Sequence, residues 1–189
     1  NTHAFLNRYP TTDTNRNRAR SRWTYYHFLG VDIEKSAPRT TDPVALADTD
    51  NPTMNNPACT VCHELLDPLA GAFQNFGDTG RYRDGYLGLD ALPSSYKYPE
   101  DPEAERLYEE GDTWFRDMRT PGFDGGIVNN PDHSLPWLGE RMAEDPRFAT
   151  AAVKFWWPAV MGSSVALAPE EITDSDYSER LALFEEQNS

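Results

Sequence analysis

The sequence has few of the residues that form cross-links and metal clusters, with two cysteines and four histidines among 189 residues. No apolar run approaches the ~18 residues that a membrane-spanning helix needs. Basic residues are also scarce, since 17 Lys and Arg stand against 31 Asp and Glu, for a net charge of −14. This acidity argues against a nucleic-acid partner. It favours either plain solubility or a basic partner protein.

Both cysteines lie in one motif, Cys59 and Cys62 with two residues between them, and His63 follows directly. This Cys-x-x-Cys-His pattern is typical of covalent c-type haem attachment. On a helix, residues three or four apart share a face, so both thiols can reach one edge of a porphyrin while the imidazole points toward its iron. Asn56 as N-cap and Pro57 as first residue predict that a helix begins here. We therefore expect one covalent haem c.

Three other interpretations of the motif compete with haem attachment. A redox dithiol would follow an apolar strand in a βαβ unit, and no such strand precedes Cys59. A zinc site needs four ligands, which would have to include His3, His27, His133 or carboxylates, with no finger-like spacing among them. A disulfide between cysteines this close is strained and leaves the adjacent histidine unexplained. Haem attachment is the favoured interpretation.

The arginine-rich stretch 12–30 predicts a helix that begins at Asp13 or Thr14 and ends before Gly30. Helical spacing predicts that its core-facing residues are Ala19, Trp23, Tyr26 and Leu29. The arginines would then form a solvated or acid-paired face. Alternatively, Arg20 or Arg22 pairs with a haem propionate, because a guanidinium fork matches a carboxylate.

The remaining chain predicts a mainly α fold: a cytochrome-c-like helical haem domain with long irregular loops and one small β-hairpin. A loop is expected over 31–57, and Asp67-Pro68 predicts the start of a second short helix that Gly77 ends. The Gly-rich stretch 77–85 predicts a tight turn or small hairpin, and 120–135 a loop. Pro158 is expected to kink or end its helix. Further helices are predicted over 100–118, 136–144, 146–157 and 176–187.

The second axial ligand of a six-coordinate iron would be a methionine or histidine. Met118 is the first choice, because it leaves a predicted helix and enters a Pro-Gly turn. The alternatives are His133 and Met161, and Met54 if its loop folds over the ring. A methionine at helical spacing is also ordinary core filler, so the sequence leaves this ligand open.

Residues 56–83 resemble the haem-motif domain of large secreted bacterial proteins, the planctomycete-type cytochrome c family of uncharacterised function. In that family, as here, the attachment motif is followed by Asp-Pro, a Phe-rich segment and a Gly-Arg-aromatic-Arg turn. The later segments 122–125 and 145–149 also fit, so the similarity spans most of 15–165. The resemblance implies an exported protein with covalent haem, and it makes Arg81 and Arg83 candidates for propionate contacts. The acidity and the Trp-Trp-Pro segment ending at Pro158 depart from the family.

The sequence therefore predicts an exported monohaem c-type cytochrome that relays single electrons, at the bacterial periplasm or cell surface, as part of a larger assembly. One alternative is a haem enzyme with an open, peroxidase-like iron, with His133 or an arginine on the distal side. Another is a haem-stapled binding subunit of a cell-surface complex. The expected parts are an N-terminal helix and loop (1–55), the haem domain (56–165) and a helical tail (166–189), together one compact unit of a longer protein.

Overall fold

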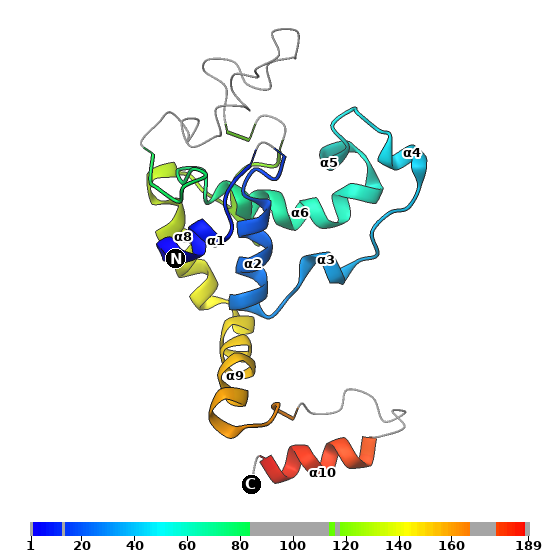
Figure 1. Cartoon of the computed structure of the whole chain (residues 1–189), viewed down its shortest axis with the longest axis vertical. Helices are drawn as coiled ribbons and strands as arrows, with labels where there is room; N and C mark the ends of the chain where they lie inside the picture. Colours follow the sequence, from blue (N-terminus) through cyan, green and yellow to red (C-terminus); the bar gives the residue numbers. More distant parts are fainter. Residues whose placement is uncertain (1, 13, 84–113, 116–117, 167–176, 188–189) are drawn as a thin grey trace.

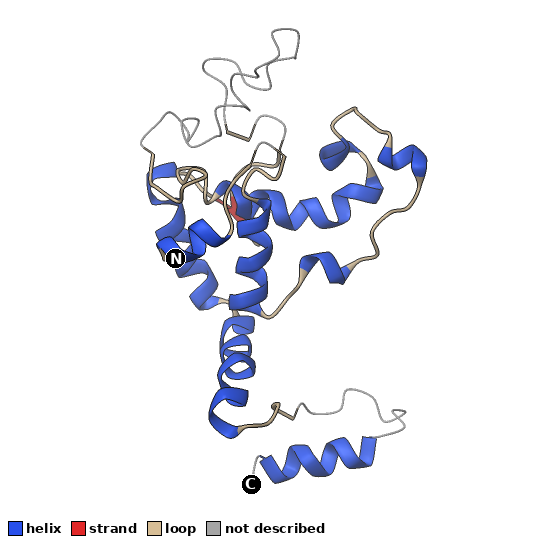
Figure 2. Cartoon of the chain, in the orientation of Figure 1, coloured by secondary structure: helices blue, strands red, loops and turns tan. Residues whose placement is uncertain are grey.

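The computed structural model describes residues 2–187 apart from 13, 84–113, 116–117 and 167–176. It is mainly helical, with one small two-stranded antiparallel hairpin and long loops, which confirms the predicted fold class (Figure 2). The elements, in chain order, are α1 (His3–Arg8), α2 (Arg18–Leu29), α3 (Ile33–Ser36), α4 (Pro43–Leu46), α5 (Pro52–Asn55), α6 (Pro57–Gly71), β1 (Gly122–Phe123), β2 (Gly126–Ile127), η2 (Pro131–His133), α8 (Ser134–Glu144), α9 (Pro146–Met161) and α10 (Tyr177–Gln187).

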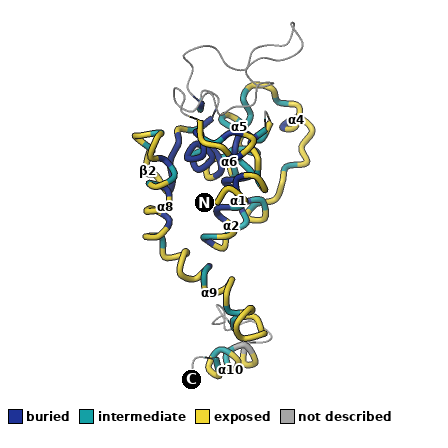
Figure 3. Tube along the Cα trace, turned by 60° about the vertical axis from the view of Figure 1, so that its left-hand side comes forward, coloured by how far each residue is buried: buried dark blue, intermediate teal, exposed yellow. Residues whose placement is uncertain are grey.

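Helices α2 and α6 form the centre of the fold, and α9 packs against α2 (Figure 1). One apolar cluster joins α1, α2, α6, β1 and α8, through Leu6, Tyr25, Leu66, Phe123 and Leu138 among others. Figure 3 shows the buried segments gathered around α2 and α6, whereas α9 is exposed along most of its length. The segment 31–56 leaves α2, passes through the one-turn helices α3, α4 and α5, and returns to the start of α6 (Figure 1).

Helix α2 ends as predicted but begins later. Gly30 adopts the left-handed conformation, with φ of 68°, directly after Leu29, where only glycine is free of steric cost. At the other end, Arg16 and Asn17 have φ of 43° and 66°, so the backbone cannot be helical there and α2 begins at Arg18.

The face of α2 that meets the core also differs from the prediction. Tyr26 is 45% exposed, Ala19 and Trp23 are half-buried, and of the predicted set Leu29 alone is buried. The side chains buried instead are Arg20, Ser21, Thr24 and Tyr25. Apolar periodicity missed this face because most of it is polar.

Helix α6 begins as predicted, because the Asn56 side chain accepts a hydrogen bond from the Ala58 backbone N–H at 3.0 Å and Pro57 is the first helical residue. The second helix predicted from Asp67-Pro68 is wrong, since α6 continues through Pro68 to Gly71. A proline removes one helical hydrogen bond, which leaves the carbonyl four residues earlier without its donor. That carbonyl belongs to Glu64, which is exposed, so water can satisfy it.

The small hairpin lies within a stretch predicted to be loop. Strands β1 and β2 pair antiparallel, Phe123 opposite Gly126, and the residues between them, Asp124 and Gly125, have φ of 48° and 79°. The turn predicted after Gly77 is confirmed as a turn closed by a single bridge between Phe76 and Tyr82.

The C-terminal helices mostly follow the sequence prediction. Helix α8 begins two residues earlier than expected, and α10 matches the expected range within one residue. Of the two outcomes predicted for Pro158, a kink in its helix or the end of that helix, the second is wrong, because α9 continues to Met161. The carbonyl that Pro158 deprives of a donor belongs to the exposed Lys154, so solvent can bond it. Most of the helix predicted over 100–118 lies outside the described residues.

Candidate haem attachment site

Both cysteine side chains are part-buried on the first two turns of α6, and neither forms a disulfide. The Cys62 Sγ lies 3.9 Å from the Ile33 carbonyl oxygen and packs beside the main core. Burial, followed by the nearby charge of Glu34, raises the pKa of the Cys62 thiol. The two sulfurs sit three residues apart on one helix, as two neighbouring attachment points require.

The imidazole of His63 is held by a carboxylate from the next turn of the same helix. His63 Nδ1 lies 2.9 Å from Asp67 Oδ1, and Asp67 is fully buried. Arg18, the first residue of α2, grips the same carboxylate with two bonds, from Nε to Oδ1 at 2.7 Å and from Nη2 to Oδ2 at 3.0 Å. With Nδ1 donating to Asp67, Nε2 is the nitrogen that remains for a metal.

The ionised state of Asp67 follows from the same contacts. Burial raises the pKa of this carboxyl, but hydrogen bonds from His63 and Arg18 outweigh the burial and hold the pKa below its usual value. The side chain of Arg18 is 18% exposed, so the guanidinium keeps a path to water while its partner has none. An anion is thus fixed beside Nδ1 of the His63 ring.

Exposed aliphatic side chains lie on α6 and α4. On α6, Val61 is 50% and Leu65 44% exposed. On α4, within the segment 31–56, Val44 is 77% and Leu46 66% exposed. Two free thiols and an imidazole with Nε2 available are the groups that hold a covalent haem. The residues present therefore fit that group.

The arginines expected near propionates lie in different settings. Arg20 is fully buried, and its five N–H groups are donated to Asn17 Oδ1 and to backbone carbonyls. It has no N–H left for a propionate, so we leave it out of the proposed site. Arg22 bonds Asp32 through Nε and Nη2, both at 3.0 Å. Arg81 and Arg83 are exposed, and their role stays a prediction.

The candidate distal ligands are spread over the structure. Met118 is buried and packs with Ala70 of α6 and with Trp114. His133 is exposed in η2, Met161 is 58% exposed at the end of α9, and Met54 is half-buried on α5. Helix α5 contacts α6. Ligation by Met118 stays a prediction, and the structure also gives that side chain the role of a core residue.

Sequence reasoning missed Asp67 and Arg18 as site residues. Asp67 was interpreted as a helix cap because Pro68 follows it. The available signal was the four-residue spacing from His63, which places two side chains on one face of a helix. Nothing local marks Arg18, because it lies 49 positions from Asp67 in the sequence.

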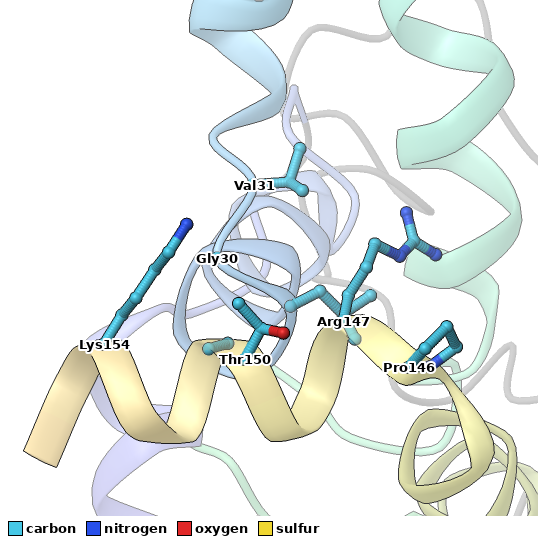
Figure 4. Close-up of a pocket in the computed structure, with 8 residues that line it drawn as sticks. Gly30, Val31, Pro146, Arg147, Thr150 and Lys154 are labelled. Carbon is cyan, nitrogen blue, oxygen red and sulfur yellow. The ribbon is translucent and has the colours of Figure 1, made fainter. Parts of the chain in front are cut away.

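A separate cavity of about 350 Å³ lies where the end of α2 meets the start of α9 (Figure 4). Two cationic side chains, Arg147 and Lys154, border it together with Thr150. Arg147 is already bonded to the Asp145 carboxylate, with Nε at 2.9 Å from Oδ1. None of the haem-motif residues lines this cavity, so it is distinct from the candidate haem site.

Comparison with known proteins supports the resemblance in part. Residues 1–86 match a family model described as PSCyt3, protein of unknown function (DUF1588), whose name suggests a planctomycete cytochrome-like domain. The matched range contains the whole of α1 to α6, and with them Cys59, Cys62, His63, Asp67 and Arg18. No curated protein and no solved structure matches the chain. Among the helices that the structure describes, none is long and apolar enough to cross a membrane.

Proposed function

We propose that this protein is a monohaem c-type cytochrome that relays single electrons. Cys59 and Cys62 carry the haem through thioether bonds, and His63 binds its iron. The observation that carries the proposal is the arrangement on α6, where two free thiols and an imidazole with its Nδ1 already engaged lie within two turns. The PSCyt3 match over the same residues supports it.

The haem, when bound, supplies one-electron redox chemistry. The chain's own residues hold and shield it. The α6 backbone fixes the two sulfurs, and Asp67 fixes the His63 ring. A Met118 sulfur would complete a six-coordinate iron, and Arg81 and Arg83 would bond the propionates.

The setting of the proposed function follows from charge and from the attachment chemistry. The net charge of −14 favours a basic redox partner. Covalent haem is attached outside the bacterial cytoplasm, so we place the protein in the periplasm or at the cell surface, within a larger assembly.

The test is export of the chain from a bacterium that has c-type haem-attachment machinery. The purified protein should be red, should keep its colour after acid-acetone treatment, and should show the added mass of one haem when denatured. Replacing both cysteines, Cys59→Ser with Cys62→Ser, should abolish attachment. His63→Ala should alter the spectrum, whereas His3→Ala, at an exposed position of α1, serves as the matched control. Recovery of the bare polypeptide from such cells would refute the proposal.

A second candidate function is an enzyme with an open iron acting on peroxide. The specific observation in its favour is the hydrogen bond from His63 to the Asp67 carboxylate, which strengthens electron donation by the imidazole. Optical spectra distinguish the two functions. A low-spin, six-coordinate iron supports the relay, whereas a high-spin iron that readily binds cyanide supports the enzyme. A low-spin signal that persists in Met118→Ala would remove that residue as ligand.

A further inference from the structure

We infer that Asp67, held by Arg18, is a positioning residue that orients His63 toward the iron and lowers the reduction potential of the haem. The inference deepens the proposed function and rests on it. It assigns a role to a contact between α2 and α6, two helices that meet in the centre of the fold.

The geometry leaves the His63 ring one favourable orientation. Its Nδ1 is 2.9 Å from Asp67 Oδ1, and both oxygens of that carboxylate are also bonded by Arg18. Asp67 is fully buried, so water does not compete for its oxygens. Because the carboxylate cannot turn without breaking two bonds to the guanidinium, the imidazole that donates to it is fixed as well.

Arg18 owes its place to the unusual start of α2. The left-handed backbone at Arg16 and Asn17 prevents an earlier helical turn, so Arg18 is the first helical residue. From that position its side chain crosses to α6 and meets the carboxylate. The tertiary fold thus supplies the cation that lets a carboxylate be buried next to the ring.

The effect on the haem follows from charge. Oxidised iron carries one more positive charge than reduced iron, and an imidazole that donates to a carboxylate is a more electron-rich ligand. Both effects favour the oxidised state, so Asp67 lowers the potential. Arg18 opposes part of this effect, because its positive charge lies within hydrogen-bond distance of the same oxygens. The two residues should therefore act on the potential in opposite directions.

A purely structural ion pair between α2 and α6 would behave differently. Replacing either partner would lower stability, and the reduction potential of the haem would not shift in opposite directions in the two variants. Glu64 provides the matched control, because it is next to His63 on the same helix, carries the same charge as Asp67 and is 61% exposed beside Arg119. Its charge is screened by solvent, and it makes no contact with His63 among the described residues.

The experiment measures the reduction potential of the haem-loaded chain by spectroelectrochemical titration in the wild type and three variants. Asp67→Asn should raise the potential, and Arg18→Gln should lower it. Glu64→Gln should shift it by much less than Asp67→Asn. Haem content and thermal unfolding of each variant are measured on the same preparations.

The outcomes separate this inference from the function on which it rests. A wild-type chain that takes up no haem overturns both. A loaded chain whose potential does not move in opposite directions in Asp67→Asn and Arg18→Gln, or moves as far in Glu64→Gln as in Asp67→Asn, overturns the positioning role alone. If Asp67→Asn fails to fold, Arg18→Gln decides, because it changes neither partner of the His63–Asp67 bond: its potential must fall.

Discussion

Replacing Arg20 by methionine should destabilise the protein far more than the same replacement at Arg22, two positions along α2. Arg20 is fully buried and donates to the backbone carbonyls of Leu6, Tyr9, Phe76 and Gly77. Burial lowers the pKa of this guanidinium to about 10, with Asp78 acting in the other direction. The side chain is therefore still charged at neutral pH, and each of its bonds is charge-assisted.

The magnitude follows from the groups left behind. Methionine fills the space with an apolar chain and offers no donor, so the four carbonyls lose this partner, although the Gly77 carbonyl keeps the Gly80 N–H as a second donor at 3.0 Å. A buried polar group without a partner costs about 1–3 kcal/mol. Counting the low end for the carbonyls of Leu6, Tyr9 and Phe76, because some water will enter, gives a loss of about 3 kcal/mol. That is a large share of the 5–15 kcal/mol that stabilises a typical domain.

Arg22 provides the control because it lies on the same helix and changes in the same way. Its side chain is 23% exposed and pairs with Asp32 and Glu34 at the surface. Surface pairs of this kind contribute about 0–1 kcal/mol. Urea unfolding followed by far-ultraviolet circular dichroism measures both variants against wild type. If the urea midpoints of Arg20→Met and Arg22→Met agree within error, the role given to the buried hydrogen bonds of Arg20 is refuted.

Two further predictions concern single side chains. A Cβ at Gly71 would lie 2.5 Å from Pro121 Cγ and 2.8 Å from its Cα, so Gly71→Ala should lower the stability by about 1–3 kcal/mol. A Cβ at Gly139, inside α8, meets nothing within 4 Å, so Gly139→Ala should raise the stability by about 0.5–1 kcal/mol. Thermal unfolding measures both variants, and stability changes of the same sign would contradict the packing at Gly71. Hydrogen bonds from Arg22 hold the pKa of Asp32 below its usual value, so this carboxylate stabilises the fold above its unfolded pKa of about 3.9 and loses that effect as pH falls through the folded pKa. Asp32→Asn keeps a capping side chain and should reduce the fall in stability on acidification, and an unchanged pH profile would contradict the pairing.

Local chemistry allowed the helix ends to be predicted where the chain itself supplies the cap. Asn56 and Pro57 begin α6, and Gly30 ends α2. The start of α2 could not be predicted this way because distant partners determine it. The Asn17 side chain donates to the Phe73 carbonyl at 3.2 Å, and Arg16 donates to the Trp114 carbonyl. These contacts accompany the left-handed backbone, and no residue near position 16 in the sequence reveals them.

The residues of the candidate site divide in the same way, into those that the local sequence reveals and those that depend on distant partners. Cys59, Cys62 and His63 could be identified from their spacing, because all three lie within two turns of one helix. Asp67 belongs to the next turn and was assigned to capping, since an Asp-Pro pair commonly begins a helix. Its partner Arg18 comes from another helix, so only the fold could reveal the pair.

The PSCyt3 match ends at residue 86, but the core that supports the site extends further along the chain. Phe123, Leu138 and Met142 belong to the same apolar cluster as Leu66 of α6. The Ser134 hydroxyl donates to the carbonyl of Ala72 at 2.7 Å, which joins the start of α8 to the residue after α6. Helix α6 must be rigid if it is to hold two sulfurs and an imidazole in register. The later elements provide part of that rigidity, so the structural unit behind the proposed haem site is larger than the matched range.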